Sequence, residues 1–139
     1  MDKKSLAPLA AVFAISGAWD TIGAIMYIFL IGSGRKIDSP AIDPFYAVFI
    51  GSFLICFAYL QFLSAMNIRR YAFNVGCLII GRAFYVIQLY AYMGLVRDFP
   101  RTLWYTGIVD GAFTLLYAFL AMRGGLGARD LFLPRRDAD

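Results

Sequence analysis

Three ionisable residues lie deep inside apolar stretches of this 139-residue sequence and are its main candidates for chemistry: Asp20, Arg82 and Asp110. If those stretches are helices, each residue lies about 18–24 Å from the helix end on the same side, because a helix rises about 1.5 Å per residue. All three then fall near one level. An arginine can hydrogen-bond one carboxylate and still reach another, so we expect Arg82 to bridge Asp20 and Asp110.

The faces around the two aspartates favour this inward arrangement. A lone charge in the centre of a bilayer costs about 2.5–3.5 kcal/mol even on a lenient insertion scale, so three separate exposures to lipid are unfavourable. Small residues allow helix backbones to approach closely, and hydroxyl groups can hydrogen-bond carboxylates. Such residues share the predicted faces of the aspartates: Ser16, Gly17, Gly23 and Ala24 near Asp20, and Thr106, Gly107 and Thr114 near Asp110.

Polar and aromatic residues on the same helices extend the predicted site. The third apolar stretch carries a mildly polar stripe that consists of Asn74, Gly81, Tyr85, Gln88 and Tyr92. The second stretch offers the polar or thiol side chains of Ser52, Cys56 and Tyr59. Aromatic walls for cation–π contact are available from Trp19, Tyr27, Tyr85 and Tyr117. The predicted ligand-binding set is therefore Asp20, Arg82, Asp110, Trp19, Tyr85, Thr114 and Tyr117.

Two interpretations of the charged cluster stay open. It can fix the packing register of the helices, because removing one partner of a buried ion pair strands the other. It can also bind a ligand or ion, as intramembrane ionisable residues commonly do. Two aspartates and one arginine leave one negative charge, which a proton or a cation would neutralise in a low-dielectric interior. That balance suits a proton-coupled carrier or a site for a cationic amphiphile.

The elements that must position these residues are four long apolar segments. Hydrophobic residues make up 61% of the chain and charged residues 16%, well away from the composition of soluble domains. Crossing a bilayer core about 30 Å thick takes about 20 helical residues. Four segments meet this requirement: Leu6–Ile31, Pro44–Ile68, Tyr71–Val96 and Thr102–Met122. The first is too long for the core of a cleaved signal peptide.

Short connections and basic residues predict the topology. Neighbouring helices joined by short turns run antiparallel, so the fold class is an all-α, up-down-up-down four-helix bundle. Eight basic residues fall on one side and four on the other, which predicts a chain integral to a bacterial-type cytoplasmic (inner) membrane with both termini in the cytoplasm. The first set is Lys3, Lys4, Arg69, Arg70, Arg123, Arg129, Arg135 and Arg136, and the second is Arg35, Lys36, Arg97 and Arg101. The net charge of +4 thus reflects topology, not nucleic-acid binding.

The predicted organisation is one transmembrane domain, residues 1–123, followed by a cytoplasmic tail, residues 124–139. All five prolines lie at or near helix ends, so we expect uninterrupted helices. The tail loses helical periodicity. Its apolar residues 131–133 either rest on the membrane surface or belong to a disordered segment.

The residue types that are missing exclude several function classes. The chain has no histidine and no glutamate, so haem ligation by histidine and a histidine–cysteine metal cluster are excluded. No cofactor is expected. Cys56 and Cys77 lie at depths that differ too much for a disulfide. The one enzyme mechanism left is an aspartyl dyad of Asp20 and Asp110 that activates water.

Three resemblances bear on function. The segment 107–110 resembles one motif of the lipoprotein signal peptidases, four-span aspartyl enzymes, although their Asn-containing motifs are missing here. Asp20 beside Trp19 resembles the first helix of small multidrug exporters, which are shorter and lack a midspan arginine in the third helix. The whole chain resembles small uncharacterised bacterial membrane proteins with Asp in the first span, a basic residue in the third and Asp before a Phe-rich fourth, which implies no activity.

Three classes of function follow. The first is a non-enzymatic protein that binds a lipid-like or amphiphilic ligand in an interior polar site, or serves as an accessory subunit of a membrane complex. The second is a small proton- or cation-coupled transporter or channel that works as an oligomer. The third is an intramembrane aspartyl hydrolase. Unbroken helices and a nearly neutral cluster favour the first class. The expected partners are membrane lipids, a small amphiphilic ligand and copies of this chain or other membrane subunits.

Overall fold

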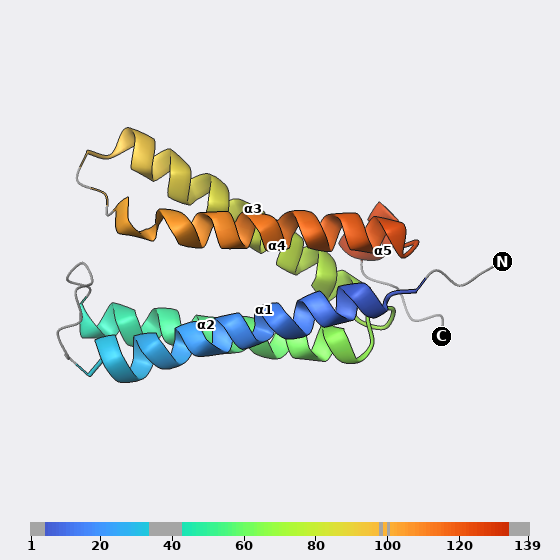
Figure 1. Ribbon diagram of the computed structural model, residues 1–139, viewed down its shortest axis with the longest axis horizontal. Helices are drawn as coiled ribbons and strands as arrows, with labels where there is room; N and C mark the ends of the chain where they lie inside the picture. The colour runs from blue at the N-terminus through green and yellow to red at the C-terminus, as the bar shows by residue number, and fades with distance from the viewer. Residues whose placement is uncertain (1–4, 34–42, 98, 100, 134–139) are drawn as a thin grey trace.

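Four long helices make up most of the computed structural model, which describes residues 5–33, 43–97, 99 and 101–133 (Figure 1). No strand occurs within these residues. All four helices are long and apolar enough to cross a membrane. They are α1 (Ala7–Ile25) with its continuation η1 (Met26–Ile31), α2 (Pro44–Met66), α3 (Ala72–Leu95) and α4 (Trp104–Arg123). The four predicted segments are confirmed to within two residues at each end.

Local sequence signals fix the helix ends. Asp43 caps α2, because its carboxylate accepts a hydrogen bond from the main-chain N–H of Phe45 at 2.8 Å, and Pro44 occupies the first helical position. The turn between α2 and α3 is closed by Asn67, whose side-chain oxygen accepts from the N–H of Arg70 at 3.1 Å. Gly125 follows α4 with a φ of +81°, a left-handed conformation that glycine adopts without strain.

The helices associate as two pairs, α1 with α2 and α3 with α4 (Figure 1). Within the first pair, a Cβ on Gly51 would lie 3.1 Å from the carbonyl oxygen of Ala24. Within the second, a Cβ on Gly107 would lie 2.8 Å from the side chain of Leu89. Small residues at these two positions therefore allow the close approach of backbones that packing inside a membrane requires.

The end of the first span departs from the regular helix expected from the sequence. Residues Met26–Ile31 form a π-helical segment rather than a further α-helical turn. In this segment Ile28 packs directly against Gly51 of α2. The absence of interior prolines predicts uninterrupted helices. A π-helical segment forms without a proline, so this signal does not reveal it.

The apolar core lies at one end of the bundle, here called the core end, where Leu6 contacts Gly124. Phe13, Val75 and Tyr117 are each fully buried there. The opposite end, which carries Ile31 and Trp104, is called the far end; there the two helix pairs lie farther apart (Figure 1). Packing at the core end holds the pairs together and leaves polar side chains room to meet nearer mid-length.

Part of the predicted tail belongs to the core. Residues Ala128–Phe132 form a short helix, α5, that packs against α3. Leu131 is only 5% exposed, whereas Phe132 and Leu133 are 42% and 56% exposed. The two predictions for this segment, contact with the membrane surface and disorder, are therefore both wrong for Leu131. A five-residue helix produces too little periodicity to be recognised from sequence. The division of the chain at residue 124 stays a prediction.

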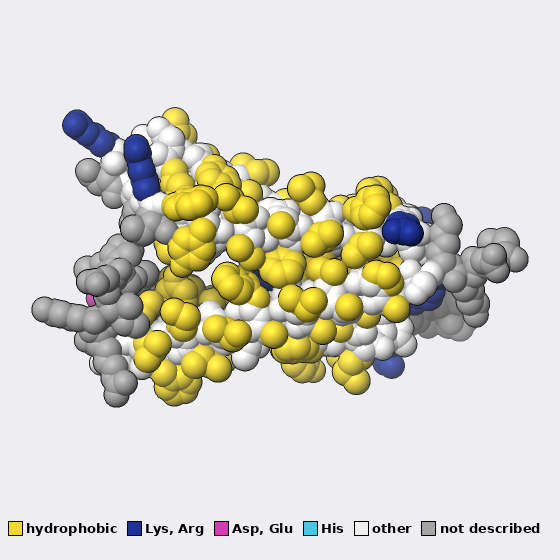
Figure 2. Space-filling model, viewed as in Figure 1, with side chains coloured by type: hydrophobic (Ala, Val, Ile, Leu, Met, Phe, Trp, Pro, Cys, Tyr) yellow, Lys and Arg dark blue, Asp and Glu magenta, His cyan; other side chains and the backbone are white. Residues whose placement is uncertain are grey.

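The surface between the two ends is strongly apolar (Figure 2). Large exposed hydrophobic residues occur on all four helices, among them Phe29, Phe53, Ile87 and Leu115. Cys56 and Cys77 are free cysteines, and both are exposed. Apolar surface this extensive suits helices surrounded by lipid. The predictions that concern residues 34–42, which include Arg35, Lys36 and Pro40, lie outside the described residues, as do those for Lys3, Lys4, Pro100, Pro134, Arg135 and Arg136.

The contact of α5 with α3 leads to a test at Gly76. An added Cβ there would collide with the main-chain carbonyl of Leu131, so Gly76→Ala should displace α5. We expect a loss of about 1–3 kcal/mol in stability, typical of overpacking, and faster amide hydrogen exchange in residues 128–132. Gly94→Ala is the matched control on the same helix, because nothing lies within 4 Å of its added Cβ. Equal exchange rates in both variants would contradict the docking of α5.

Candidate functional site

Asp20, Arg82 and Asp110 meet inside the bundle, from α1, α3 and α4 respectively. Arg82 Nη2 donates to Asp20 Oδ2 at 2.6 Å, and Arg82 Nη1 pairs with Asp110 Oδ1. Asp20 is 5% exposed and Arg82 7% exposed. The predicted bridge is confirmed. The guanidinium divides its two terminal nitrogens between two acids, which ties three helices together at one level.

Two aromatic rings from α4 enclose the guanidinium of Arg82. The ring centroid of Phe113 lies 5.2 Å from Arg82 Cζ, and that of Tyr117 lies 6.0 Å away. Cations are attracted to the faces of such rings, more so when water is excluded. Arg82 Nε is buried and has no hydrogen-bond partner among the described residues. The rings and the two carboxylates thus stabilise a cation that would otherwise be very unfavourable in a membrane interior.

Gln61 of α2 brings the fourth helix into the cluster and was missed by sequence reasoning. It is completely buried, and its Nε2 donates to Asp20 Oδ2 at 2.5 Å. Its Oε1 accepts a hydrogen bond from Ser16. A usable signal existed, because Gln61 shares a helix face with the small residues Ala47, Gly51 and Ala58, all of which are buried.

The polar residues actually expected from α2 point elsewhere. Ser52, Cys56 and Tyr59 are all exposed, and Tyr59 has 65% of its surface accessible. The polarity of these three side chains therefore does not identify the face of α2 that packs against the other helices. In a membrane helix, the stripe of small residues marks the face that packs against its neighbours.

Tyr117 ends a chain of hydrogen bonds that leads to Asp20. It is fully buried and stacks on Phe13 with ring centroids 4.1 Å apart. Its hydroxyl pairs with that of Ser16. The Ser16 hydroxyl also lies within hydrogen-bond distance of Gln61 Oε1 and of the main-chain oxygen of Phe13, and the Tyr117 hydroxyl lies 3.4 Å from Gln61 Oε1. Tyr117, Ser16 and Gln61 thus form one hydrogen-bonded network that reaches Asp20 through Gln61 Nε2, and such networks strengthen cooperatively.

The remaining predicted site residues lie beside the cluster rather than within it. Thr114 donates to the main-chain oxygen of Asp110 at 2.7 Å and not to a carboxylate. Tyr85 is hydrogen-bonded to Thr106 at 2.8 Å, one turn farther along α3 and α4 toward the far end. Trp19 is 41% exposed. A role in ligand binding for these three residues stays a prediction.

A shallow cavity begins next to Tyr85 on the side of the far end. It has a volume of about 270 Å³ and is lined by Tyr85, Gln88, Leu89, Tyr92 and Phe99. Three of these residues belong to the polar stripe that was predicted for the third helix. Within the described residues, no three His, Cys, Asp or Glu side chains gather as they would around a metal ion.

Comparison with models of known protein families, with curated protein sequences and with solved structures gave no significant match. The function of the site must therefore be argued from its own geometry.

The bridging position of Arg82 predicts unequal effects of two substitutions. Arg82→Ala leaves Asp20 and Asp110 both unpaired and should reduce the stability in detergent by about 3–5 kcal/mol. Asp20→Asn keeps the side-chain shape and a carbonyl acceptor for Gln61 and Arg82, so its loss should be clearly smaller. Thermal unfolding of both variants in the same micelle measures the difference. Equal small losses would show that the cluster does not form.

Proposed function

We propose that this chain is an integral protein of a bacterial-type cytoplasmic membrane, with an up-down-up-down bundle and both termini in the cytoplasm. Four helices of 20–25 residues match the thickness of a bilayer core. Among the described basic residues, Arg69, Arg70, Arg123 and Arg129 belong to the core end, whereas Arg97 and Arg101 belong to the far end. An excess of basic residues marks the cytoplasmic side.

Cysteine labelling tests this topology. In a background in which Cys56 and Cys77 are replaced by alanine, Arg97→Cys should react with a membrane-impermeant maleimide in intact cells. Ser5→Cys and Arg129→Cys should react only after the cells are permeabilised, because both lie at the core end. Labelling of Ser5→Cys in intact cells would reverse the proposed orientation.

Within this topology, the protein binds the cationic group of an amphiphilic ligand at Asp110. The observation that supports this function is the unequal pairing of the two acids. Asp20 accepts from both Arg82 and Gln61, whereas Asp110 is paired only with Arg82, through Oδ1. No described residue donates to the other oxygen, Oδ2, and the Asp110 side chain is 14% exposed against 7% for Asp20. The surplus negative charge is therefore most available at Asp110.

The surroundings of Asp110 suit an amphiphile better than a bare ion. Tyr85 and Thr106 lie one turn toward the far end, and Tyr85 also lines the cavity there, together with Gln88, Leu89, Tyr92 and Phe99. Tyr27, in η1 at the far end of the first span, is half-buried and offers a further aromatic ring. Aromatic faces attract alkylammonium groups, while the apolar tail of the ligand can remain in contact with lipid.

The proposal predicts that a cationic amphiphile binds and that Asp110→Asn weakens the binding. The probe is dodecyltrimethylammonium, titrated by calorimetry into the protein in neutral maltoside micelles. We expect at least a tenfold loss of affinity in Asp110→Asn, about 1.4 kcal/mol, because the carboxylate supplies the attraction. The uncharged dodecyl amine oxide should bind weakly to both proteins.

Asp43→Asn is the matched control, because it removes one aspartate at the start of α2 and keeps a side chain that can cap the helix. Its affinity for dodecyltrimethylammonium should equal that of the parent protein. If Asp110→Asn also binds like the parent, the proposal fails and the cluster acts only to fix helix packing.

A small proton-coupled transporter, working as an oligomer, is the second candidate. The charge balance of the cluster supports it, because two carboxylates face one guanidinium and a bound proton would neutralise the surplus negative charge. A pH-dependent substrate flux in vesicles that disappears in Asp20→Asn would support this candidate. An aspartyl hydrolase receives less support, because Arg82 stands between the two carboxylates, which in such enzymes share a proton.

A further inference from the structure

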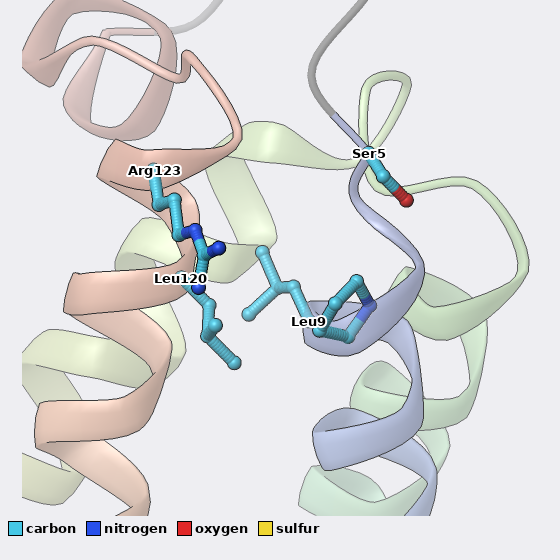
Figure 3. Close-up of a pocket in the computed structure, with 5 residues that line it drawn as sticks. Ser5, Leu9, Leu120 and Arg123 are labelled. Carbon is cyan, nitrogen blue, oxygen red and sulfur yellow. The ribbon is translucent and has the colours of Figure 1, made fainter.

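A second cavity lies at the core end, between the start of α1 and the end of α4. Its volume is about 460 Å³, and its lining consists of Ser5, Pro8, Leu9, Leu120 and Arg123. Figure 3 shows the guanidinium of Arg123 beside Leu120, pointing across the space between the helices toward Leu9. The space is therefore a groove with an apolar floor and one cation on its wall.

The Arg123 side chain is available for a ligand. It is exposed, and it forms no ion pair with a carboxylate among the described residues. A guanidinium offers five N–H donors in a planar fork that matches the oxygens of a phosphate. Ser5 adds a hydroxyl donor on the opposite wall, because its oxygen only accepts, from the N–H of Ala7 at 3.3 Å.

The level of the groove matches the boundary between lipid tails and headgroups. Helix α4 has 20 residues, so it spans about 30 Å from Trp104 to Arg123, the thickness of a hydrocarbon core. Arg123 at the last helical position then lies at the depth of lipid phosphates. Arg69, Arg70 and Arg129 belong to the same end of the bundle and make its surroundings electropositive.

We propose that this groove binds an anionic phospholipid. The phosphate lies on the Arg123 guanidinium and accepts from the Ser5 hydroxyl, and one acyl chain runs along Leu9 and Leu120. The excess of positive charge at this end selects an anionic headgroup over a zwitterionic one. This site is distinct from the Asp110 site, from which it is separated by about 20 Å along α4, and it binds a ligand of the opposite charge.

The test measures the affinity of the full-length protein for lipids in neutral micelles by native mass spectrometry. The probes are phosphatidylglycerol, phosphatidylcholine with the same acyl chains, and glycerol 3-phosphate. The parent protein should prefer phosphatidylglycerol to phosphatidylcholine by at least fivefold and show no binding of glycerol 3-phosphate. Arg123→Gln should lower the affinity for phosphatidylglycerol at least fivefold.

Arg69→Gln is the matched control, because it removes one exposed positive charge from the same end without touching the groove. It should change the affinity less than twofold. Equal losses in both variants would overturn the proposal in favour of diffuse attraction by the whole basic end. Tight binding of glycerol 3-phosphate would overturn it in favour of a free-phosphate site. Helicity and monodispersity of Arg123→Gln, which alters an exposed residue, confirm that the variant is folded.

Discussion

The intolerance of hydrocarbon for an isolated charge is the constraint on which this structure depends. Arg82 can be buried only because Asp20 and Asp110 reach it from neighbouring helices and because Phe113 and Tyr117 cover it. Gln61 then completes the cluster from α2. Each of the four long helices thus contributes at least one polar group to one buried network, which requires a particular rotation and depth for every helix.

The same constraint explains what could be predicted from the sequence. Length and hydropathy located the four helices, because a span needs about 20 apolar residues and little else. The depth of Asp20, Arg82 and Asp110, together with the cost of leaving them apart, was enough to predict the bridge by Arg82.

The unpredicted features depend on packing rather than on hydropathy. Gln61 carries no charge, so the sequence does not show a large free-energy cost of exposing it to lipid. Its pairing with Asp20 follows only from the buried face of α2. The π-helical segment Met26–Ile31 and the docked helix α5 both arise where one segment meets another, at Gly51 and at Gly76. Contacts between distant parts of a chain leave little trace in the residue types of either part.

The division into two pairs of helices has a consequence for the neutrality of each half. Asp20 finds Gln61 within the pair formed by α1 and α2, and Arg82 finds Asp110 within the pair formed by α3 and α4. The second half is therefore neutral at this level, whereas the first half keeps the charge of Asp20, because Gln61 is an uncharged amide. The contacts between the halves, from Arg82 to Asp20 and between Tyr117 and Ser16, supply the missing cation, so the first pair of helices depends on the second for its neutrality.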